Sequence, residues 1–228
     1  MLTNGLDYPR VIEISRPHLP PLRILRLSKA FCQLTVLHLQ FYCVRTYLKP
    51  KSSSSLEQLL NALEGCCNLT QLYLHKALRL HALVPLSNPP RVIRRLEKLS
   101  TLVLLDWAAY TSWFLSSIVI APNLDLEVVG EVHRAFAVGR DIPTLVASLL
   151  PSDAHGKISQ LRTSTTACVR APDHVEPFLR ISGCNINIQL DILPSWGILE
   201  HDALDGSLTV FRTLFAGSPL TSFFVGGT

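Results

Sequence analysis

The sequence lacks two marks of an exported protein. Six cysteines among 228 residues do not form the dense disulfide framework by which small secreted domains compensate for a small core. No charged segment followed by an apolar run opens the chain, so no secretory signal peptide is predicted. We therefore expect an intracellular protein, in the cytoplasm or the nucleus.

Long apolar runs are also missing. The nearest approach to a membrane helix is the uncharged segment 107–124, which is interrupted by serines, a threonine, a proline and an asparagine. A membrane-spanning helix needs about 20 consecutive, predominantly apolar residues. We therefore expect no membrane span and no membrane partner.

Concentrated positive charge is scarce as well. The formal net charge is only +4, and the arginines are scattered along the chain. The densest basic stretch consists of Arg91, Arg94, Arg95 and Lys98, and no aromatic residues are interleaved with it as platforms for base stacking. This distribution argues against a nucleic-acid partner, and we interpret the stretch as a solvated loop and helix edge.

The sequence does contain enough apolar residues for a large core. Hydrophobic residues make up 48% of the chain and charged residues 17%, which argues against wholesale disorder. The length is compatible with one domain of solenoid type or with two small domains. Prolines and weak periodicity predict an irregular lead-in over residues 1–21, and residues 22–228 are expected to form the folded domain.

The stretch Ser55–Leu74 combines a helix and a strand in one unit. Ser55 and Gln58 form a helix-start pattern, because the hydroxyl and the amide can each satisfy a free backbone N–H. Gly65 can supply the left-handed residue that ends such a helix. The next segment, 69–74, reads LxxLxL, and its end alternates as a short strand does. The leucines of the helix share one face: Leu56, Leu59, Leu60 and Leu63.

This unit recurs along the chain. Residues 202–225 repeat it, with Asp202 as the helix cap, Gly217 as the stop and a strand at the end. Copies of LxxLxL, some of them degenerate, begin at Leu22, Leu34, Leu69, Leu99, Leu124, Leu161 and Leu220. Repeats of this form bury their leucines only by stacking on their neighbours. The predicted fold is α/β: a leucine-rich-repeat-like solenoid with a parallel concave sheet and irregular helical repeats. An ordinary α/β domain with a parallel sheet is the alternative.

Other segments are assigned from their periodicity. Residues 110–118 form a largely apolar helical face, and Asp141 is expected to cap a helix that ends before Pro151. The alternation over 178–192 predicts one or two strands. Residues 161–166 are interpreted as a degenerate strand.

Several of these segments resemble the leucine-rich-repeat portion of fungal F-box proteins. They are QLTVLHLQFYCVRTYL (33–48), ALEGCCNLTQLYL (62–74), RLEKLSTLVLLDWAA (95–109), DIPTLVASLLP (141–151) and residues 182–208. The resemblance implies that the repeats select a protein substrate for a cullin–RING ubiquitin ligase. In that family an N-terminal F-box docks on the ligase adaptor. Residues 1–21 are too short and too rich in proline to form one, so an adaptor partner is expected only if an F-box precedes Met1.

Catalytic chemistry has no recognisable apparatus in this sequence. The GxSxG, P-loop, GxGxxG and HExxH patterns are all absent, so we expect no enzyme and no cofactor. Cys66 and Cys67 are adjacent, so they cannot easily both face one metal ion, and core packing is the favoured interpretation. Glu200, His201 and Asp202 form the most reactive-looking cluster, which a solvated turn with a helix cap explains best. The alternatives are a metal-dependent hydrolase centred on these three residues, or a fragmentary gene product without a partner.

The residues between the strand leucines form the predicted binding face. In LxxLxL the leucines point into the solenoid, so the intervening side chains point out. The predicted protein-binding residues are Arg26, His38, Tyr73, His75, Val103, Glu127 and Phe224. Thr165 belongs to the same row, and Ser28, Gln40 and Leu105 accompany His75 in a second row. Tyrosine and arginine are enriched at binding hot spots.

Overall fold

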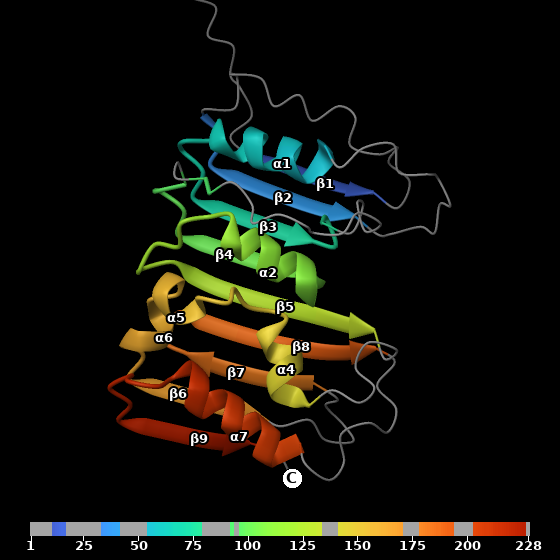
Figure 1. Cartoon of the computed structure of the whole chain (residues 1–228). Coiled ribbons are helices and arrows are strands. Elements are labelled where there is room, and N and C mark those ends of the chain that lie inside the picture. The colour runs from blue at the N-terminus through green and yellow to red at the C-terminus, as the bar shows by residue number, and fades with distance from the viewer. Residues whose placement is uncertain are drawn as a thin grey trace, which may run out of the picture.

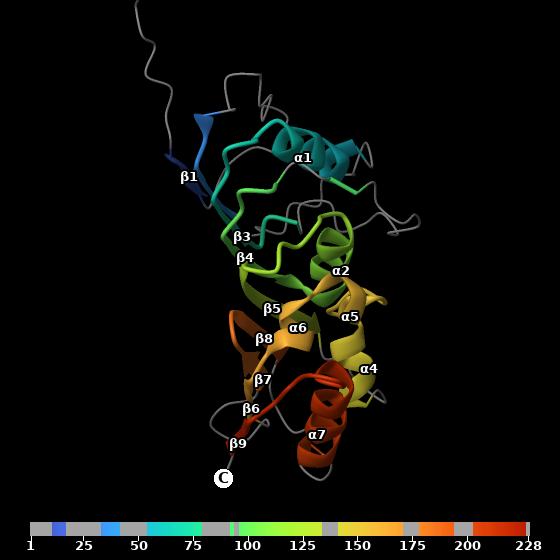
Figure 2. The same ribbon diagram turned by 90° about the vertical axis from the view of Figure 1, so that its left-hand side faces the viewer.

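The chain folds into one open sheet with helices along one face (Figures 1 and 2). The computed structural model describes residues 11–16, 33–41, 54–78, 92–93, 96–133, 141–170, 178–193 and 203–226. The strands are β1 Val11–Arg16, β2 Val36–Phe41, β3 Gln71–His75, β4 Thr101–Trp107, β5 Asp125–His133, β6 Thr166–Arg170, β7 Phe178–Gly183, β8 Ile186–Leu193 and β9 Ser222–Gly226. The helices are α1 Ser54–Glu64, α2 Ala108–Ser116, α4 Ile142–Ala147, α5 Ala154–Lys157, α6 Gln160–Thr163 and α7 Ala203–Leu214.

The sheet is mixed rather than purely parallel. Its strand order is β1-β2-β3-β4-β5-β8-β7-β6-β9. The strands β1 to β5 and β8 pair in parallel, whereas β7 is antiparallel to both β8 and β6. The prediction of an α/β fold is therefore confirmed, but the purely parallel sheet is wrong. The reason is the segment 178–193, which forms a hairpin closed by Cys184 and Asn185, with Asn185 in the left-handed region at φ 56°.

Stacked leucines build the core between the sheet and the helices. Leu37, Leu72, Leu102 and Leu126 are Cα partners on successive strands, and each is 0% exposed. A second stack, two residues further along each strand, consists of Leu39, Leu74, Leu104 and Val128. Burying a leucine side chain contributes about 2 kcal/mol, so the two stacks provide much of the favourable energy of the fold.

A repeated backbone motif sets the register at the start of each strand. The carbonyl of Thr35 accepts hydrogen bonds from the N–H groups of Thr70 (2.8 Å) and Gln71 (3.0 Å). One strand further on, the carbonyl of Thr70 accepts from Ser100 (2.8 Å) and Thr101 (3.1 Å) in the same way. Hydroxyls reinforce the ladder: Thr70 Oγ1 donates to Thr35 O at 2.9 Å, and Ser100 Oγ donates to Thr70 O at 3.0 Å. A hydroxyl after the first leucine of the motif thus links β3 to the start of β2 and β4 to the start of β3.

The helix α1 covers residues 54–64, and Leu59, Leu60 and Leu63 of its predicted apolar face are buried. Gly65 lies in the turn that follows, but the prediction of a left-handed residue at this position is wrong, because Gly65 has no positive φ. The core role predicted for the cysteine pair is confirmed for Cys66, which is fully buried with its Sγ 3.3 Å from the carbonyl of Ala62. Cys67 is exposed, and neither cysteine forms a disulfide with another described residue.

Two other predicted helix-end residues, Asp141 and Gly217, are present as expected. Asp141 Oδ1 accepts a hydrogen bond from the N–H of Thr144 at 2.9 Å, and this contact lowers the pKa of that carboxyl. Gly217 has φ +82°, a left-handed conformation that glycine adopts without strain, and it follows α7 as predicted. Asp202, the cap predicted for α7, lies outside the described residues.

Two sequence-based assignments are corrected by the structure. Residues 11–16 were expected to belong to an irregular lead-in, but they form β1 and pair in parallel with β2. Residues 161–166 were expected to form a strand, but Leu161 lies in the short helix α6 and β6 begins only at Thr166. The first LxxLxL, residues 22–27, lies outside the described residues.

The position of Leu60 in the core makes a direct test of α1. Leu60→Asp should unfold the protein or drive it into aggregation, because an uncompensated buried carboxylate costs roughly 4 kcal/mol or more. The neighbouring Asn61 is exposed on the same helix, so Asn61→Asp should fold normally and serves as the matched control. Circular dichroism and thermal melting of both variants measure the difference. Equal stability of the two variants would contradict the burial of this helix face.

Candidate protein-binding face

The sheet has one face that none of the described helices covers, and we call it the open face. Figure 2 shows the sheet edge-on, with α1, α2, α4, α5, α6 and α7 all on the same side. Because the leucine stacks point toward the helices, the residues that alternate with them point to the open face. The strand alternation predicted from LxxLxL thus places the candidate residues of β2 to β5 on this surface.

A row of side chains crosses the open face from strand to strand. His38, Tyr73, Val103 and Glu127 are successive Cα partners, and all four are partly exposed. The rings of His38 and Tyr73 lie 5.5 Å apart between centroids, at an interplanar angle of 52°. The Tyr73 hydroxyl is 3.5 Å from Oε1 of Gln71. The predicted juxtaposition of His38 and Tyr73 is therefore confirmed, while their part in binding stays a prediction.

The register extends this row beyond the residues that the sequence analysis identified. Glu127 pairs with Asn187 of β8, and the row continues through Ser182 and Cys168 to Phe224 of β9. Asn187 Nδ2 donates to Glu127 Oε1 at 3.2 Å. The Oδ1 atom of Asn187 is buried and has no hydrogen-bond partner among the described residues. Leaving a buried acceptor without a hydrogen bond costs about 1–3 kcal/mol.

A second row runs parallel to the first. Its members, in spatial order, are Gln40, His75, Leu105, Val129, Gln189, Arg180 and Arg170. The predicted residues Gln40, His75 and Leu105 are partly exposed, whereas Val129 is buried. Arg180 Nη2 donates to Gln189 Oε1 at 2.9 Å. The row thus changes from aromatic and apolar character over β3 and β4 to polar character over β7 and β8.

A charged cluster lies on the open face near the C-terminal ends of β5 and β8. Lys76 forms a 3.2 Å salt bridge with Glu131, and Glu131 is the Cα partner of Asp191. Gln189 Nε2 donates to Asp191 Oδ1 at 2.8 Å. Burial raises the pKa of Asp191, and the neighbouring Glu131 raises it further. The hydrogen bond from Gln189 and the charges of Arg180 and Lys76 act in the opposite direction on this pKa.

The remaining predicted residues lie at the β9 end of the sheet or outside the described residues. Phe224 is 62% exposed on the last strand of the sheet, and Thr165 is exposed just before β6. Arg26 and Ser28 fall outside the described residues, as do Glu200, His201 and Asp202 of the hydrolase alternative. Among the described residues, no group of three His, Cys, Asp or Glu side chains is placed to hold a metal ion.

The contribution of β7 and β8 to the open face was not predicted from the sequence. Asn187, Gln189 and Arg180 lie on the open face, and they come from strands that carry no LxxLxL motif. Their signal was present as the alternation of polar and apolar residues in Ile186–Leu190. The sequence does not show which strand this segment pairs with. β8 lies beside β5, from which it is separated by a long stretch of chain.

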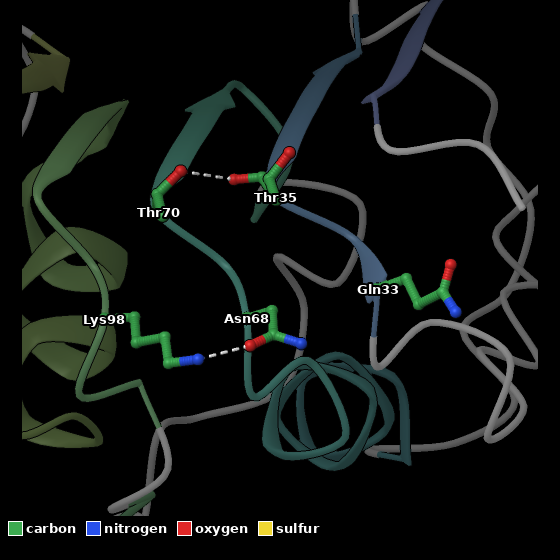
Figure 3. A pocket seen from close by; sticks show the side chains of 5 residues that line it. All are labelled: Gln33, Thr35, Asn68, Thr70 and Lys98. Carbon is green, nitrogen blue, oxygen red and sulfur yellow. Dashed lines mark hydrogen bonds between the residues drawn. The ribbon is translucent and has the colours of Figure 1, made fainter.

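Two hollows open elsewhere on the surface. A shallow polar one of about 450 Å³ lies at the start of β2 and β3, lined by Gln33, Thr35, Asn68, Thr70 and Lys98 (Figure 3). Figure 3 shows the Lys98 ammonium directed at Asn68, whose Oδ1 it meets at 2.5 Å. The other is an apolar groove of about 240 Å³ between α4, α5 and α7. The polar hollow contains one charged side chain, and that side chain is already hydrogen-bonded. The lining of the apolar groove includes Ser152, Asp153 and His155. The His155 ring contacts the carbonyl of Thr213, and Asp153 lies 3.8 Å from the Lys157 ammonium.

The raised pKa of Asp191 predicts how stability depends on pH. The folded state binds the proton of this carboxyl more readily than the unfolded chain, so its ionisation opposes folding as the pH rises. Asp191→Asn should therefore raise the melting temperature at pH 7, and the gain should vanish near pH 4, close to the ordinary aspartate pKa of about 3.9. Thermal melts across this pH range measure it, with Asp125→Asn at an exposed site of the same sheet as the control. If the rise in melting temperature were the same at every pH, it would contradict the raised pKa of Asp191.

Comparison with known proteins does not identify a relative. No family model, no curated protein and no solved structure matches this chain. Among the described residues, no helix is both long and apolar enough to cross a membrane.

Proposed function

We propose that this chain is a protein-binding domain of the leucine-rich-repeat-like solenoid type, which holds its partner on the open face. The observation that carries this proposal is the continuous row of partly exposed side chains from His38 to Asn187, on a sheet face without a described helix. A sheet face left uncovered over this many strands offers a broad surface, which suits a folded protein better than a small molecule.

The chemistry of the face suits protein recognition. Tyr73 and His38 provide aromatic area together with hydrogen-bonding groups, and tyrosine is among the residues enriched at hot spots. Val103 and Leu105 add an apolar patch beside them, and the charged cluster around Lys76 and Glu131 forms its boundary. An apolar and aromatic centre bordered by charge is the usual anatomy of a protein interface.

The wider role in this proposal is substrate recognition by an F-box subunit of a cullin–RING ubiquitin ligase. Its support is the sequence likeness of the repeat segments to fungal F-box proteins, together with the helix–strand units stacked along the sheet. Contact with the ligase adaptor additionally requires an F-box upstream of Met1. Sequencing the transcript upstream of Met1 and testing for co-purification with the adaptor examine this role separately from binding by the open face.

Paired alanine substitutions test the open face. Tyr73→Ala combined with His38→Ala should weaken binding by about 2 kcal/mol, or roughly thirtyfold in Kd, if both residues are hot spots. The melting temperature should change little, because neither side chain belongs to the core. The matched control is Arg162→Ala with Thr163→Ala, two exposed residues of α6 on the helical side.

The measurement has two steps. Affinity purification from cell extract identifies proteins retained by wild type and by the control but not by the open-face variant. The Kd of a retained protein is then measured with purified components for all three chains. A partner lost from the control instead would place recognition on the helical side. Unchanged binding in both variants would contradict the proposal.

A further inference from the structure

The strand β9 is an exposed apolar edge. It is the last strand of the sheet, and no described strand pairs with its outer side. Phe223, Phe224 and Val225 are 43%, 62% and 51% exposed. The sequence from Thr213 to Thr228 contains no charged residue. Natural proteins normally protect an edge strand with charges, prolines or bulges, because its unpaired backbone groups can pair with a strand of another chain. The strand at the other end, β1, contains Glu13 and Arg16, whereas β9 contains no such device.

The exposure of Phe223 and Val225 differs from what the sequence pattern predicts. As an LxxLxL copy, residues 220–225 were expected to bury Phe223 and Val225, and both are exposed instead. The physical reason is position: a strand in the middle of the sheet has neighbours on both sides, whereas β6 is the one described strand beside β9. Phe223 still packs on the ring of Phe211 in α7, with centroids 4.3 Å apart. The side chains are thus arranged for burial, and no described strand supplies the neighbour that would complete it.

We infer that β9 pairs with the β9 strand of a second copy of this chain, antiparallel and about a two-fold axis at Phe224. The segment Ser222–Gly226 is nearly palindromic in size and polarity. An antiparallel pairing centred on Phe224 places Phe224 opposite its own copy on the open face. It also places each Phe223 opposite the Val225 of the other copy on the helical side. Every apolar side chain of the strand then gains an apolar neighbour.

The backbone of β9 is ready for this pairing. The N–H of Ser222 donates to the carbonyl of Thr165 at 3.3 Å, toward β6. Since alternate residues of a strand direct their backbone groups to opposite edges, those of Phe223 and Val225 face outward. In the proposed register these two residues are opposite each other across the axis. Phe223 of one copy and Val225 of the other would therefore form a hydrogen-bonded antiparallel pair, in which the two residues exchange both N–H···O bonds.

Charges on α7 favour a second copy over an unrelated strand. Asp205 and Arg212 are both exposed, two helical turns apart on the same side of the helix. Under a two-fold axis the two α7 helices run antiparallel, so Asp205 of each copy lies toward Arg212 of the other. This arrangement is self-complementary, as an isologous interface requires. A foreign strand could pair with β9 but would leave this reciprocity unexplained.

The strand pairing at Phe224 and the charge pairing of Asp205 with Arg212 can share one two-fold axis. α7 runs antiparallel to β9 (Figure 1), and Phe211 stacks on Phe223. The midpoint between Asp205 and Arg212 lies about 4 Å along the helix from Phe211, at 1.5 Å per residue. A strand rises about 3.3 Å per residue, so this distance corresponds to about one residue of β9. Because α7 and β9 are antiparallel, a step toward the start of α7 is a step toward the end of β9, from Phe223 to Phe224. The axis inferred from the strand and the axis inferred from the helix charges therefore coincide.

Charge substitutions at Phe224 test the pairing and its register. Sedimentation equilibrium should give a wild-type mass twice that of the 25.3 kDa chain. Phe224→Glu and Phe224→Lys should each be monomeric, because like charges meet at the axis. A mixture of the two should restore a dimer containing one copy of each. Val119→Glu, at an exposed apolar residue far from β9, should remain dimeric, and circular dichroism confirms that all four chains fold.

The helix pair provides an independent readout. Asp205→Arg and Arg212→Asp should each weaken the dimer, and the double variant should recover it, because it exchanges the two charges in both copies. A monomeric wild type, or an open-ended polymer, would overturn the inference. So would a Phe224→Glu variant that remains dimeric, or two charged variants that fail to combine. These assays need no binding partner, so their outcome is separate from that of the proposed function.

Discussion

The stacking of leucines across neighbouring strands is the interaction on which the rest of this structure depends. Leu37, Leu72, Leu102 and Leu126 are each fully buried, and each lies beside the next in register. A slip of one residue on any strand would turn its whole leucine set to the opposite face. The hydroxyl ladder that begins at Thr35 and Thr70 holds the register at the strand starts. Hydrophobic burial and local hydrogen bonding therefore favour the same alignment.

That alignment also creates the candidate binding face. Once the stacked leucines point toward the helices, the side chains between them must form rows on the other face, whatever their chemistry. The contact between His38 and Tyr73 is a product of this register, because the two residues are far apart in the chain and lie on adjacent strands. The face is thus positioned by the core but does not contribute to it. Packing therefore constrains the leucines more strongly than the residues of the open face.

Local features of the fold could be predicted from the sequence, and long-range pairings could not. The face of α1, the caps at Asp141 and Gly217, and the outward direction of His38, Tyr73, Val103 and Glu127 follow from spacing alone. The insertion of β8 beside β5 depends on which strands meet, and alternation within a strand carries no information about its neighbour. For the same reason Asn187 and Arg180 were missed at the site. β1 was missed because its flanking prolines suggested an irregular segment.

The ends of the sheet show what stacking alone cannot provide. An interior strand such as β4 has neighbours on both sides, and its inward-facing Leu102 and Leu104 are completely buried. A terminal strand with the same apolar pattern has one neighbour and keeps half of its apolar surface in contact with water. β9 has this pattern without the charges that usually protect an edge. Closing the edge with a second copy would supply the missing neighbour by the same pairing that stabilises the interior. It would also join two open faces into one surface, so that each first row continues across the paired Phe224 side chains.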